Sequence, residues 1–401
     1  MVTLGIENIK NLVAGNSNKK VGIITNNIAR SSYLTSVLDI LVKKIGREKI
    51  VLLTPEHGYY GTAQAGLPVG SGYDNELNVM VESLYRDSKK GSSSKDQDSE
   101  MRNRDSIRDE SKYPTKETME SLDSIICDLV DIGCRIYTNI ATMVYTMSQS
   151  SNDQNFIVLD RPNPINGRDM DGPILDRKLF SFIGALPIPM RHSMTLGELA
   201  LFFNKFENES KANLKVVPVE GWSRNMWNDQ CQLDWIPSSP NIPTLTTATL
   251  YPGTVLFEGT NMSEGRGTTL PFQLIGAPWI KSDKFIRELK EEKLDGIKFM
   301  DFKFRPTFSK HVQEVCNGVL LIPEKRDLLK PFSSTLKIIS IIQRLFEDDF
   351  KFFDSYFDKA SGKDTIRKGI TDGKGIGEIL SPFQGELDNF MERKKEIVLY
   401  G

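Results

Sequence analysis

Short runs rich in Val, Ile and Leu alternate along the chain with longer segments of helical periodicity. This alternation limits the folds that the chain can adopt more than any other property of the sequence. It is typical of a parallel sheet that is covered by helices on both faces. We predict strands at residues 21–25, 50–54, 124–128, 156–160 and 214–219. The apolar spacing predicts helices at residues 33–45, 141–150 and 195–206.

A second domain is expected, because 401 residues are more than one hydrophobic core usually organises. The Pro-rich stretch at residues 235–244 interrupts regular structure and is the candidate boundary. Beyond it, helices are predicted at residues 283–292 and 334–346, and strands at residues 297–304 and 315–321. We therefore predict an α/β domain with a parallel sheet at residues 1–240 and a smaller α+β domain at residues 241–401.

A polar segment at residues 86–116 breaks the alternation, because Ser, Lys, Arg, Asp and Glu dominate it. Such a composition cannot bury enough apolar surface to offset the entropy lost on ordering. We interpret it as a mobile surface insertion. A regulatory or partner-binding segment is the alternative.

Composition excludes several classes of partner. Fifty-one Lys and Arg against 53 Asp and Glu give a formal net charge of -2, so no global basic field attracts nucleic acid or anionic lipid. The sequence shows neither a membrane span nor the basic and apolar regions of a secretory signal, and we expect a cytoplasmic protein. The four cysteines form no Cys-x-x-Cys pair, which favours reduced, mostly buried thiols. Nothing in the sequence indicates the oligomeric state.

Polar residues follow four of the predicted strands, in sets that contain Asn26, Glu56, Asp128 and Asp160. The carboxyl ends of parallel strands meet at one edge of a sheet, so these sets are expected to form one polar pocket. Glu56 precedes His57 in a loop rich in glycine, which suits a backbone that passes close to a ligand. A carboxylate beside a histidine can supply a proton donor and a neighbour that tunes it. The alternative is a capping or ion-paired Glu56 and a buried, hydrogen-bonded His57.

Two further sets contain candidate binding residues. Asp160 could bind sugar hydroxyls and Arg161 a carboxylate, or the two could form a structural pair in a Pro-rich turn. Arg191 and His192 precede a helix whose N-cap is predicted at Thr195, and capping does not explain either of them.

The polar run at residues 257–269 contains Asn261, Glu264 and Arg266 between glycines, and suits hydrogen bonding to a polyhydroxylated ligand. A solvated loop is the alternative. Three histidines without a His-x-x-x-His pair argue against a His-rich zinc centre, and the phosphate-binding loop and the Gly-x-Ser-x-Gly elbow are both missing from the sequence. We expect no metal and no cofactor. The chemistry that these exclusions leave open is acid–base chemistry by carboxylates and histidine in a polar cleft.

Seven stretches in this order resemble the exo-β-N-acetylmuramidase family typified by NamZ, and together they cover most of the chain. They are Val-Gly-Ile-Ile-Thr-Asn at 21–26, Pro-Glu-His-Gly at 55–58 with Ala-Gln-Ala-Gly at 63–66, residues 131–138, Leu-Asp-Arg-Pro-Asn-Pro-Ile at 159–165, Pro-Ile-Pro-Met-Arg-His at 187–192, residues 258–269, and Phe-Arg-Pro-Thr-Phe at 304–308.

The resemblance implies a Rossmann-like catalytic domain and a smaller auxiliary domain that closes the cleft. It implies hydrolysis that releases N-acetylmuramic acid from the non-reducing ends of peptidoglycan fragments, as in cell-wall recycling. Glu56 would be the acid/base residue, with His57 beside it. The implied substrate-binding residues are Asn26, Asp160, Arg161, Asn163, Arg191, His192, Asn261, Glu264 and Arg266. A cation for the lactyl carboxylate of the sugar would come from one of three arginines, Arg161, Arg191 or Arg266.

We expect Glu56 to act as a general acid whose pKa is raised by burial. The second catalytic group stays open between Glu264, Asp160, Glu258 and the acetamido group of the sugar itself. Family members often carry Arg and Asp where this chain has Tyr60 and Thr62, so a non-catalytic sensor that binds amino sugars or muropeptides is the alternative function. A nucleotide-dependent enzyme is a third reading, weakened by the missing Gly-rich turn after the first strand.

Overall fold

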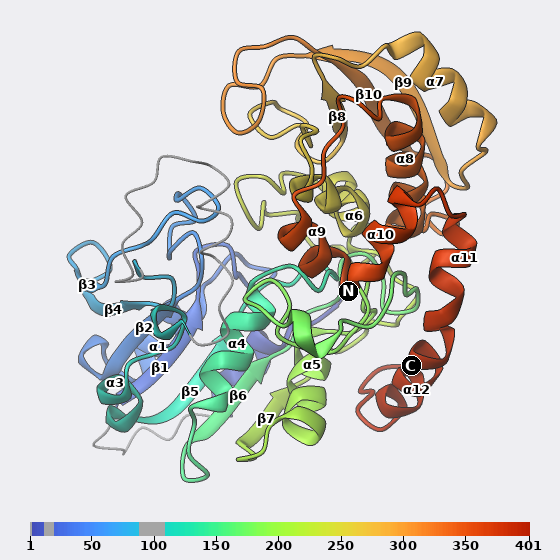
Figure 1. Ribbon diagram of the computed structural model, residues 1–401. Helices are drawn as coiled ribbons and strands as arrows, with labels where there is room; N and C mark the ends of the chain where they lie inside the picture. Colours follow the sequence, from blue (N-terminus) through green and yellow to red (C-terminus); the bar gives the residue numbers. More distant parts are fainter. Residues whose placement is uncertain (1, 12–19, 88–108) are drawn as a thin grey trace.

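The computed structural model describes residues 2–11, 20–87 and 109–401, and a seven-stranded sheet of order β3-β4-β2-β1-β5-β6-β7 forms its larger part (Figure 1). The strands are β1 (Lys20–Thr25), β2 (Ile50–Thr54), β3 (Gly72–Asp74), β4 (Val79–Ser83), β5 (Leu122–Asp128), β6 (Asn155–Leu159) and β7 (Asn213–Val217). Neighbours pair in parallel, except that β3 runs antiparallel to β4. The five predicted strands are confirmed, and the short pair β3 and β4 was not predicted.

Helices cover both faces of this sheet, as the alternation predicts. On one face, α1 (Val37–Ile45) packs Leu38 and Leu41 against the strands, and its N-terminus is fixed by a capping box at Ser36. On the other face lie α4 (Asn139–Ser148) and α5 (Leu196–Phe202), with α3 (Lys116–Ser121) at the edge. The predicted cap at Thr195 is confirmed, since its side chain accepts a hydrogen bond from the Glu198 amide.

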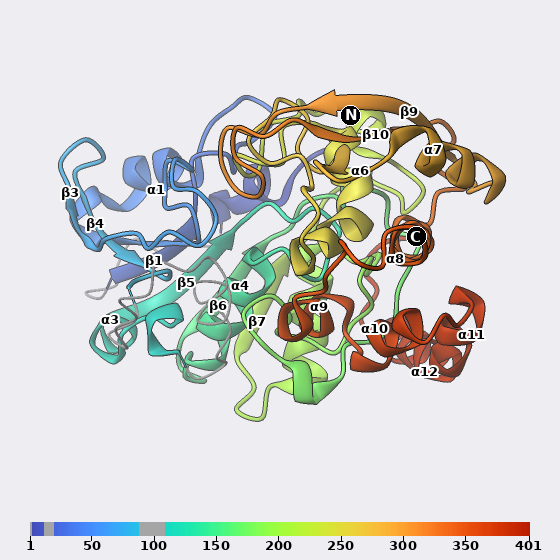
Figure 2. The ribbon, with the colours of Figure 1, turned by 45° about the horizontal axis from the view of Figure 1, so that its top comes forward.

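The second part of the chain builds a three-stranded antiparallel sheet with helices beside it, which confirms a smaller α+β unit. Its strands are β8 (Leu274–Ala277), β9 (Ile297–Phe304) and β10 (Cys316–Pro323), in the order β8-β10-β9. Its helices are α6 (Leu245–Thr254), α7 (Ser282–Glu291), α8 (Pro331–Leu345), α9 (Asp354–Ser361), α10 (Asp364–Thr371), α11 (Ile376–Leu380) and α12 (Gln384–Lys395). Figure 2 shows α9 to α12 passing beside the β7 edge of the large sheet.

Buried polar contacts join the two parts. Arg135 is 2 % exposed, and its guanidinium donates to the carbonyls of Pro173, Ile188 and Ala360, the last of which lies in α9. Asp171 accepts hydrogen bonds from the first amides of α8. One hydrophobic cluster also contains side chains from both sides of residue 240. The domain boundary at this position stays a prediction.

The predicted insertion at 86–116 is only partly described, because residues 88–108 lie outside the described residues. Its described C-terminal end is packed, which corrects the expectation of a mobile surface segment for these residues. Lys112 is 5 % exposed, and its ammonium group lies 3.2 Å from the ring centroid of Tyr85. A cation over an aromatic face gains electrostatic energy that offsets part of the cost of burial.

Two other expectations concern cysteines and membrane spans. The four cysteines are buried and free of disulfides, as predicted. Within residues 2–11, 20–87 and 109–401, no helix combines the length and the apolar character needed to cross a bilayer.

Candidate active site

A small pocket of about 60 Å³ lies where the loop after β2 meets the second part of the chain. The first part contributes polar side chains from the loop after β2 and from the start of α4, and the second part contributes a carboxylate, a guanidinium and a phenol. The polar residues that line the pocket include Glu56, His57, Thr138, Glu258, Arg266 and Tyr356. Both parts of the chain are therefore needed to form this pocket.

Glu56 is 8 % exposed, and two hydrogen bonds hold its carboxyl group in place. The hydroxyl of Thr138 donates to Oε2 at 2.8 Å, and the backbone amide of Gly66 donates to Oε1 at 2.7 Å. Thr138 is the N-cap residue of α4, so a helix terminus fixes one side of the carboxyl. The geometry presents Glu56 to the pocket in a single defined orientation.

His57 lies beside Glu56 on a backbone with φ of +73°, a left-handed conformation that a non-glycine residue rarely adopts. Its ring atom Nδ1 lies 2.7 Å from the carbonyl oxygen of Ala63, which closes the glycine-rich loop on itself. Gly58 follows with the same sign of φ. Backbone strain of this kind clusters at functional sites.

Glu258 supplies a second carboxylate to the pocket, and two neighbours hold it. The hydroxyl of Tyr356 in α9 donates to Oε2 of Glu258, and Arg266 forms an ion pair with Oε1. Burial alone would lower the pKa of Arg266, but Glu258 and Glu264 outweigh burial and raise that pKa above its usual range. Arg266 therefore stays protonated, and its charge stabilises a negative charge on Glu258.

Glu264 and Asn261 lie outside the residues that line this pocket. Glu264 is 1 % exposed, and burial opposes its charge, but Lys310 at 2.9 Å and Arg266 at 3.7 Å prevail and lower its pKa. Glu264 therefore forms an ion pair with Arg266 without lining the pocket itself. Asn261 bonds the backbone of Asp349 and Lys351, so its amide is a structural link between two loops.

Asp160 is fully buried, which contradicts the expectation that it binds sugar hydroxyls. Its carboxyl accepts hydrogen bonds from the hydroxyls of Thr195 and Tyr400, at 2.7 and 2.5 Å, and from the amide of Gly197 at 2.7 Å. Burial raises the pKa of Asp160 to about 6, and these hydrogen bonds partly offset that rise. The residue anchors the C-terminus of the chain to the large sheet.

Three other predicted binding residues are also structural, since each is at most 3 % exposed. Asn163 bonds the backbone at Ile165 and Met194. Arg191 donates to the carbonyl of Ile165, and its pKa is lowered by burial. Nδ1 of His192 accepts from the Met194 amide at 3.1 Å. A sugar in the pocket would contact none of these three.

The expectation of one pocket is wrong, because the loops at the carboxyl edge line two hollows and no described residue lines both. Arg161 lines the second hollow, while Asn26 is 6 % exposed and lines neither. The Glu56 pocket thus brings together Glu56, His57 and Arg266 from the predicted set.

Sequence reasoning missed Thr138 and Tyr356. Thr138 ends one of the stretches that carry the resemblance, which was a usable signal, whereas nothing local singles out Tyr356. Within the described residues, no group of three or more His, Cys, Asp or Glu side chains has a geometry that could hold a metal ion.

The fold and this pocket define a Rossmann-like α/β protein with two carboxylates facing one small cavity, an arrangement suited to glycoside hydrolysis. The chain belongs to the exo-β-N-acetylmuramidase NamZ family. The N-terminal part of that family matches residues 21–102 and 105–246, and its C-terminal part matches residues 249–400.

Individual relatives agree with this assignment. The chain is 40 % identical over 384 residues to the peptidoglycan β-N-acetylmuramidase NamZ of Bacillus subtilis (strain 168). The aligned region covers 95 % of this chain and 87 % of the relative. Two crystal structures of DUF1343 family proteins from Bacteroides fragilis NCTC 9343 have the same fold. Their TM-scores are 0.85 and 0.73, at 29 % and 28 % identity, and both alignments cover 100 % of this chain and 99 % of the other.

Proposed function

We propose that this chain is an exo-acting β-N-acetylmuramidase that releases terminal N-acetylmuramic acid from the non-reducing ends of peptidoglycan fragments. The observation that carries the proposal is the placement of Glu56 and Glu258 on one small pocket, one from each part of the chain. The substrate class rests on the family and on the activity named for the B. subtilis relative. The exo mode of action likewise rests on the family.

Glu56 is the general acid in this proposal. It must carry a proton in the substrate complex and transfer it to the glycosidic oxygen as that oxygen leaves the anomeric carbon. Its hydrogen bonds from Thr138 and Gly66 supply the orientation that such a transfer needs. His57 stiffens the loop through its contact with Ala63.

Glu258 is the second carboxylate. Arg266 forms an ion pair with it, and in this proposal the Glu258 carboxylate stabilises the positive charge that develops on the sugar as the bond breaks. The two other candidates, Asp160 and Glu264, do not line the pocket. The anomeric configuration of the first product distinguishes direct attack by water, which inverts, from a retaining route through Glu258 or the acetamido oxygen of the sugar.

Arg266 is the cation we assign to the lactyl carboxylate. It is the only Arg or Lys among the described residues that line the pocket. A guanidinium has five donors, so it can hold Glu258 and still bind a carboxylate of the substrate. Of the other two arginines, Arg191 is buried and Arg161 lines the other hollow.

The sensor alternative rested on Tyr60 and Thr62, and neither residue lines the pocket. Tyr60 is 40 % exposed, and its hydroxyl bonds Asp74. These two departures from the family pattern therefore lie outside the pocket lining.

A chromogenic β-N-acetylmuramide assay tests the proposal, with the matching β-N-acetylglucosaminide as the control. We expect release of the chromophore from the first substrate and little from the second, because the second lacks the lactyl carboxylate. Calorimetric binding of N-acetylmuramic acid without any release of chromophore would establish the sensor instead.

A further inference from the structure

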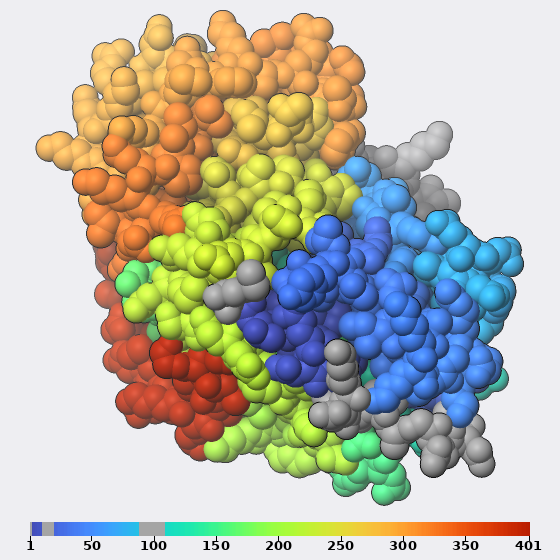
Figure 3. Space-filling model, turned by 180° about the vertical axis from the view of Figure 1, so that it is seen from behind, coloured from blue at the N-terminus to red at the C-terminus, as the bar shows by residue number. Residues whose placement is uncertain are grey.

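A second cavity, of about 100 Å³, lies at the point where the order of the large sheet reverses. The chain leaves β1 for β2 on one side and later places β5 on the other side of β1. In open parallel sheets, ligands bind outside the carboxyl ends of strands at such a point. Loops after β1, β5 and β6 form one side of the cavity, and residues 228–236 form the other. Figure 3 shows the blue N-terminal segments meeting the yellow-green segment on this face.

Arg161 lines this cavity, and one of its donors has no partner among the described residues. Its Nε donates to Oδ1 of Asp128 at 2.8 Å, and its Nη1 donates to the carbonyl of Arg30 at 2.8 Å. These bonds fix the guanidinium, whose Nη2 is buried without a hydrogen-bond partner. Leaving a buried donor without an acceptor costs free energy, so the Nη2 group calls for an acceptor.

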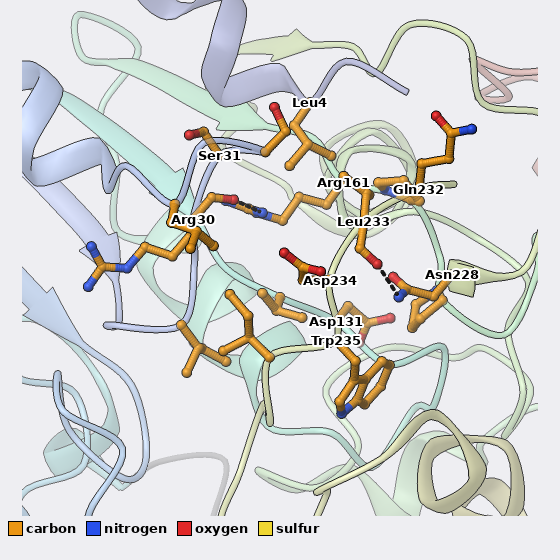
Figure 4. Close-up of a pocket in the computed structure, with 17 residues that line it drawn as sticks. Leu4, Arg30, Ser31, Asp131, Arg161, Asn228, Gln232, Leu233, Asp234 and Trp235 are labelled. Carbon is orange, nitrogen blue, oxygen red and sulfur yellow. Dashed lines mark hydrogen bonds between the residues drawn. The ribbon is translucent and has the colours of Figure 1, made fainter. Parts of the chain in front are cut away.

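Asp131 lines the same cavity, and one of its acceptors has no partner in the part of the chain that the structure describes. Its side chain is 5 % exposed, Oδ2 accepts from the Gly133 amide at 2.7 Å, and the same oxygen lies 3.2 Å from Nε2 of His192. Its other oxygen, Oδ1, is buried without a hydrogen-bond partner. Asp234, on the facing segment, adds a second carboxylate that is exposed. Figure 4 shows Arg161, Asp234 and Asp131 arranged around one hollow, with Trp235 beside them.

This combination of charges selects the class of ligand. A phosphate would meet Asp131 and Asp234, and a bare cation would meet Arg161, so both are disfavoured. A neutral sugar would offer only uncharged partners, and hydrogen bonds between two charged groups are stronger. A zwitterion satisfies both signs at once, and Trp235, Pro162 and neighbouring apolar side chains provide a surface for its carbon atoms.

We propose that this cavity is a second binding site, separate from the Glu56 pocket, for a small free α-amino acid. The carboxylate of the ligand accepts from Arg161 Nη2, and its ammonium group donates to Asp131 and Asp234. Two chain segments pass from this cavity to the Glu56 pocket. Residues 130–131 and 235–236 line the cavity, and residues 136–138 and 239–242, a few positions further along, contribute to the Glu56 pocket.

Isothermal titration calorimetry with D-alanine and L-alanine tests the proposal on the full chain. We expect saturable binding at one site, with acetate and ethylamine, which carry one charge each, at least about tenfold weaker. Asp234→Asn should weaken binding by about tenfold, equal to about 1.4 kcal/mol. Asp372→Asn, at an exposed site in the second part of the chain, is the matched control and should bind like the wild type. Glu56→Gln should also bind like the wild type, which separates this site from the proposed activity.

A second readout keeps the test decisive if Asp234→Asn folds poorly. The indole N–H resonance of Trp235, assigned with Trp235→Phe, should shift on addition of the amino acid. The proposal is overturned if neither alanine enantiomer binds, if Asp234→Asn binds as the wild type does, or if inorganic phosphate or N-acetylglucosamine shifts the same resonance more strongly.

Discussion

The hydroxyl of Thr138 donates a hydrogen bond of 2.8 Å to Oε2 of Glu56, and this bond joins the N-terminus of α4 to the loop after β2. The two residues are 82 positions apart in the chain. Because α4 packs on the large sheet, the orientation of Glu56 depends on the core as well as on the Gly66 amide of its own loop.

Replacing Thr138 by Val should lower kcat about tenfold and leave KM nearly unchanged, because the methyl group fills the same space but cannot orient the carboxyl. Thr371→Val, on the exposed face of α10, is the control and should be silent. Steady-state kinetics on the chromogenic muramide measures both. A rise in KM alone would mean that Thr138 binds substrate instead of positioning Glu56.

Glu258→Gln should reduce kcat by roughly two orders of magnitude or more, because the neutral amide cannot stabilise the positive charge on the sugar. Tyr356→Phe removes one hydrogen bond to Glu258 but leaves the charge, so its loss should be about tenfold. Azide should restore turnover to Glu258→Ala if this carboxylate faces the anomeric carbon. Equal losses in Glu264→Gln and Glu258→Gln would contradict the assignment.

Asp160 should make stability depend on pH. Its pKa is raised from 3.8 to about 6 by burial, so its stabilising contribution is complete below 3.8 and is lost as the pH rises through about 6. This rise of the Asp160 pKa from 3.8 to about 6 corresponds to about 3 kcal/mol. Asp160→Asn lacks this loss, so the wild type should lose about 3 kcal/mol relative to the variant between about pH 4 and about pH 7. Urea unfolding over that range measures it, and parallel curves would contradict it.

Arg135→Met should lower the free energy of unfolding by about 3 kcal/mol, because three carbonyls lose a buried donor. Burial lowers the pKa of Arg135 to about 10, which shows that burying this guanidinium is unfavourable. Its three hydrogen bonds offset that unfavourable free energy. Arg344→Met, whose side chain is 61 % exposed, is the control and should change stability by less than about 1 kcal/mol. Chemical denaturation of both variants tests the role of Arg135 as a link between the two parts.

The strands at the centre of the large sheet were predictable because a strand buried on both faces must be a continuous run of apolar residues. β1, with Ile23 and Ile24 fully buried, shows this directly. The three-residue strand β3 carries no such run, since its residues are exposed or half-buried. The cytoplasmic location expected from the sequence stays a prediction.

The candidate site was predictable only in part, because burial depends on tertiary packing. Asp160 follows a strand just as Glu56 does, but its carboxyl is covered by residues distant in sequence, Thr195, Gly197 and Tyr400. The pairing of Glu258 with Tyr356, 98 positions apart, likewise leaves no local pattern. Position after a strand thus identified the edge of the sheet but not which side chains face a cavity.

The rate of release of N-acetylmuramic acid by Glu56→Gln, measured beside its melting temperature, tests the central claim most directly. Gln keeps the size of the side chain, but its single oxygen can accept only one of the two hydrogen bonds from Gly66 and Thr138, and it has no acidic proton. We predict that kcat falls by several orders of magnitude while Tm changes little. A variant that turns over at the wild-type rate would contradict the assignment of Glu56 as the general acid.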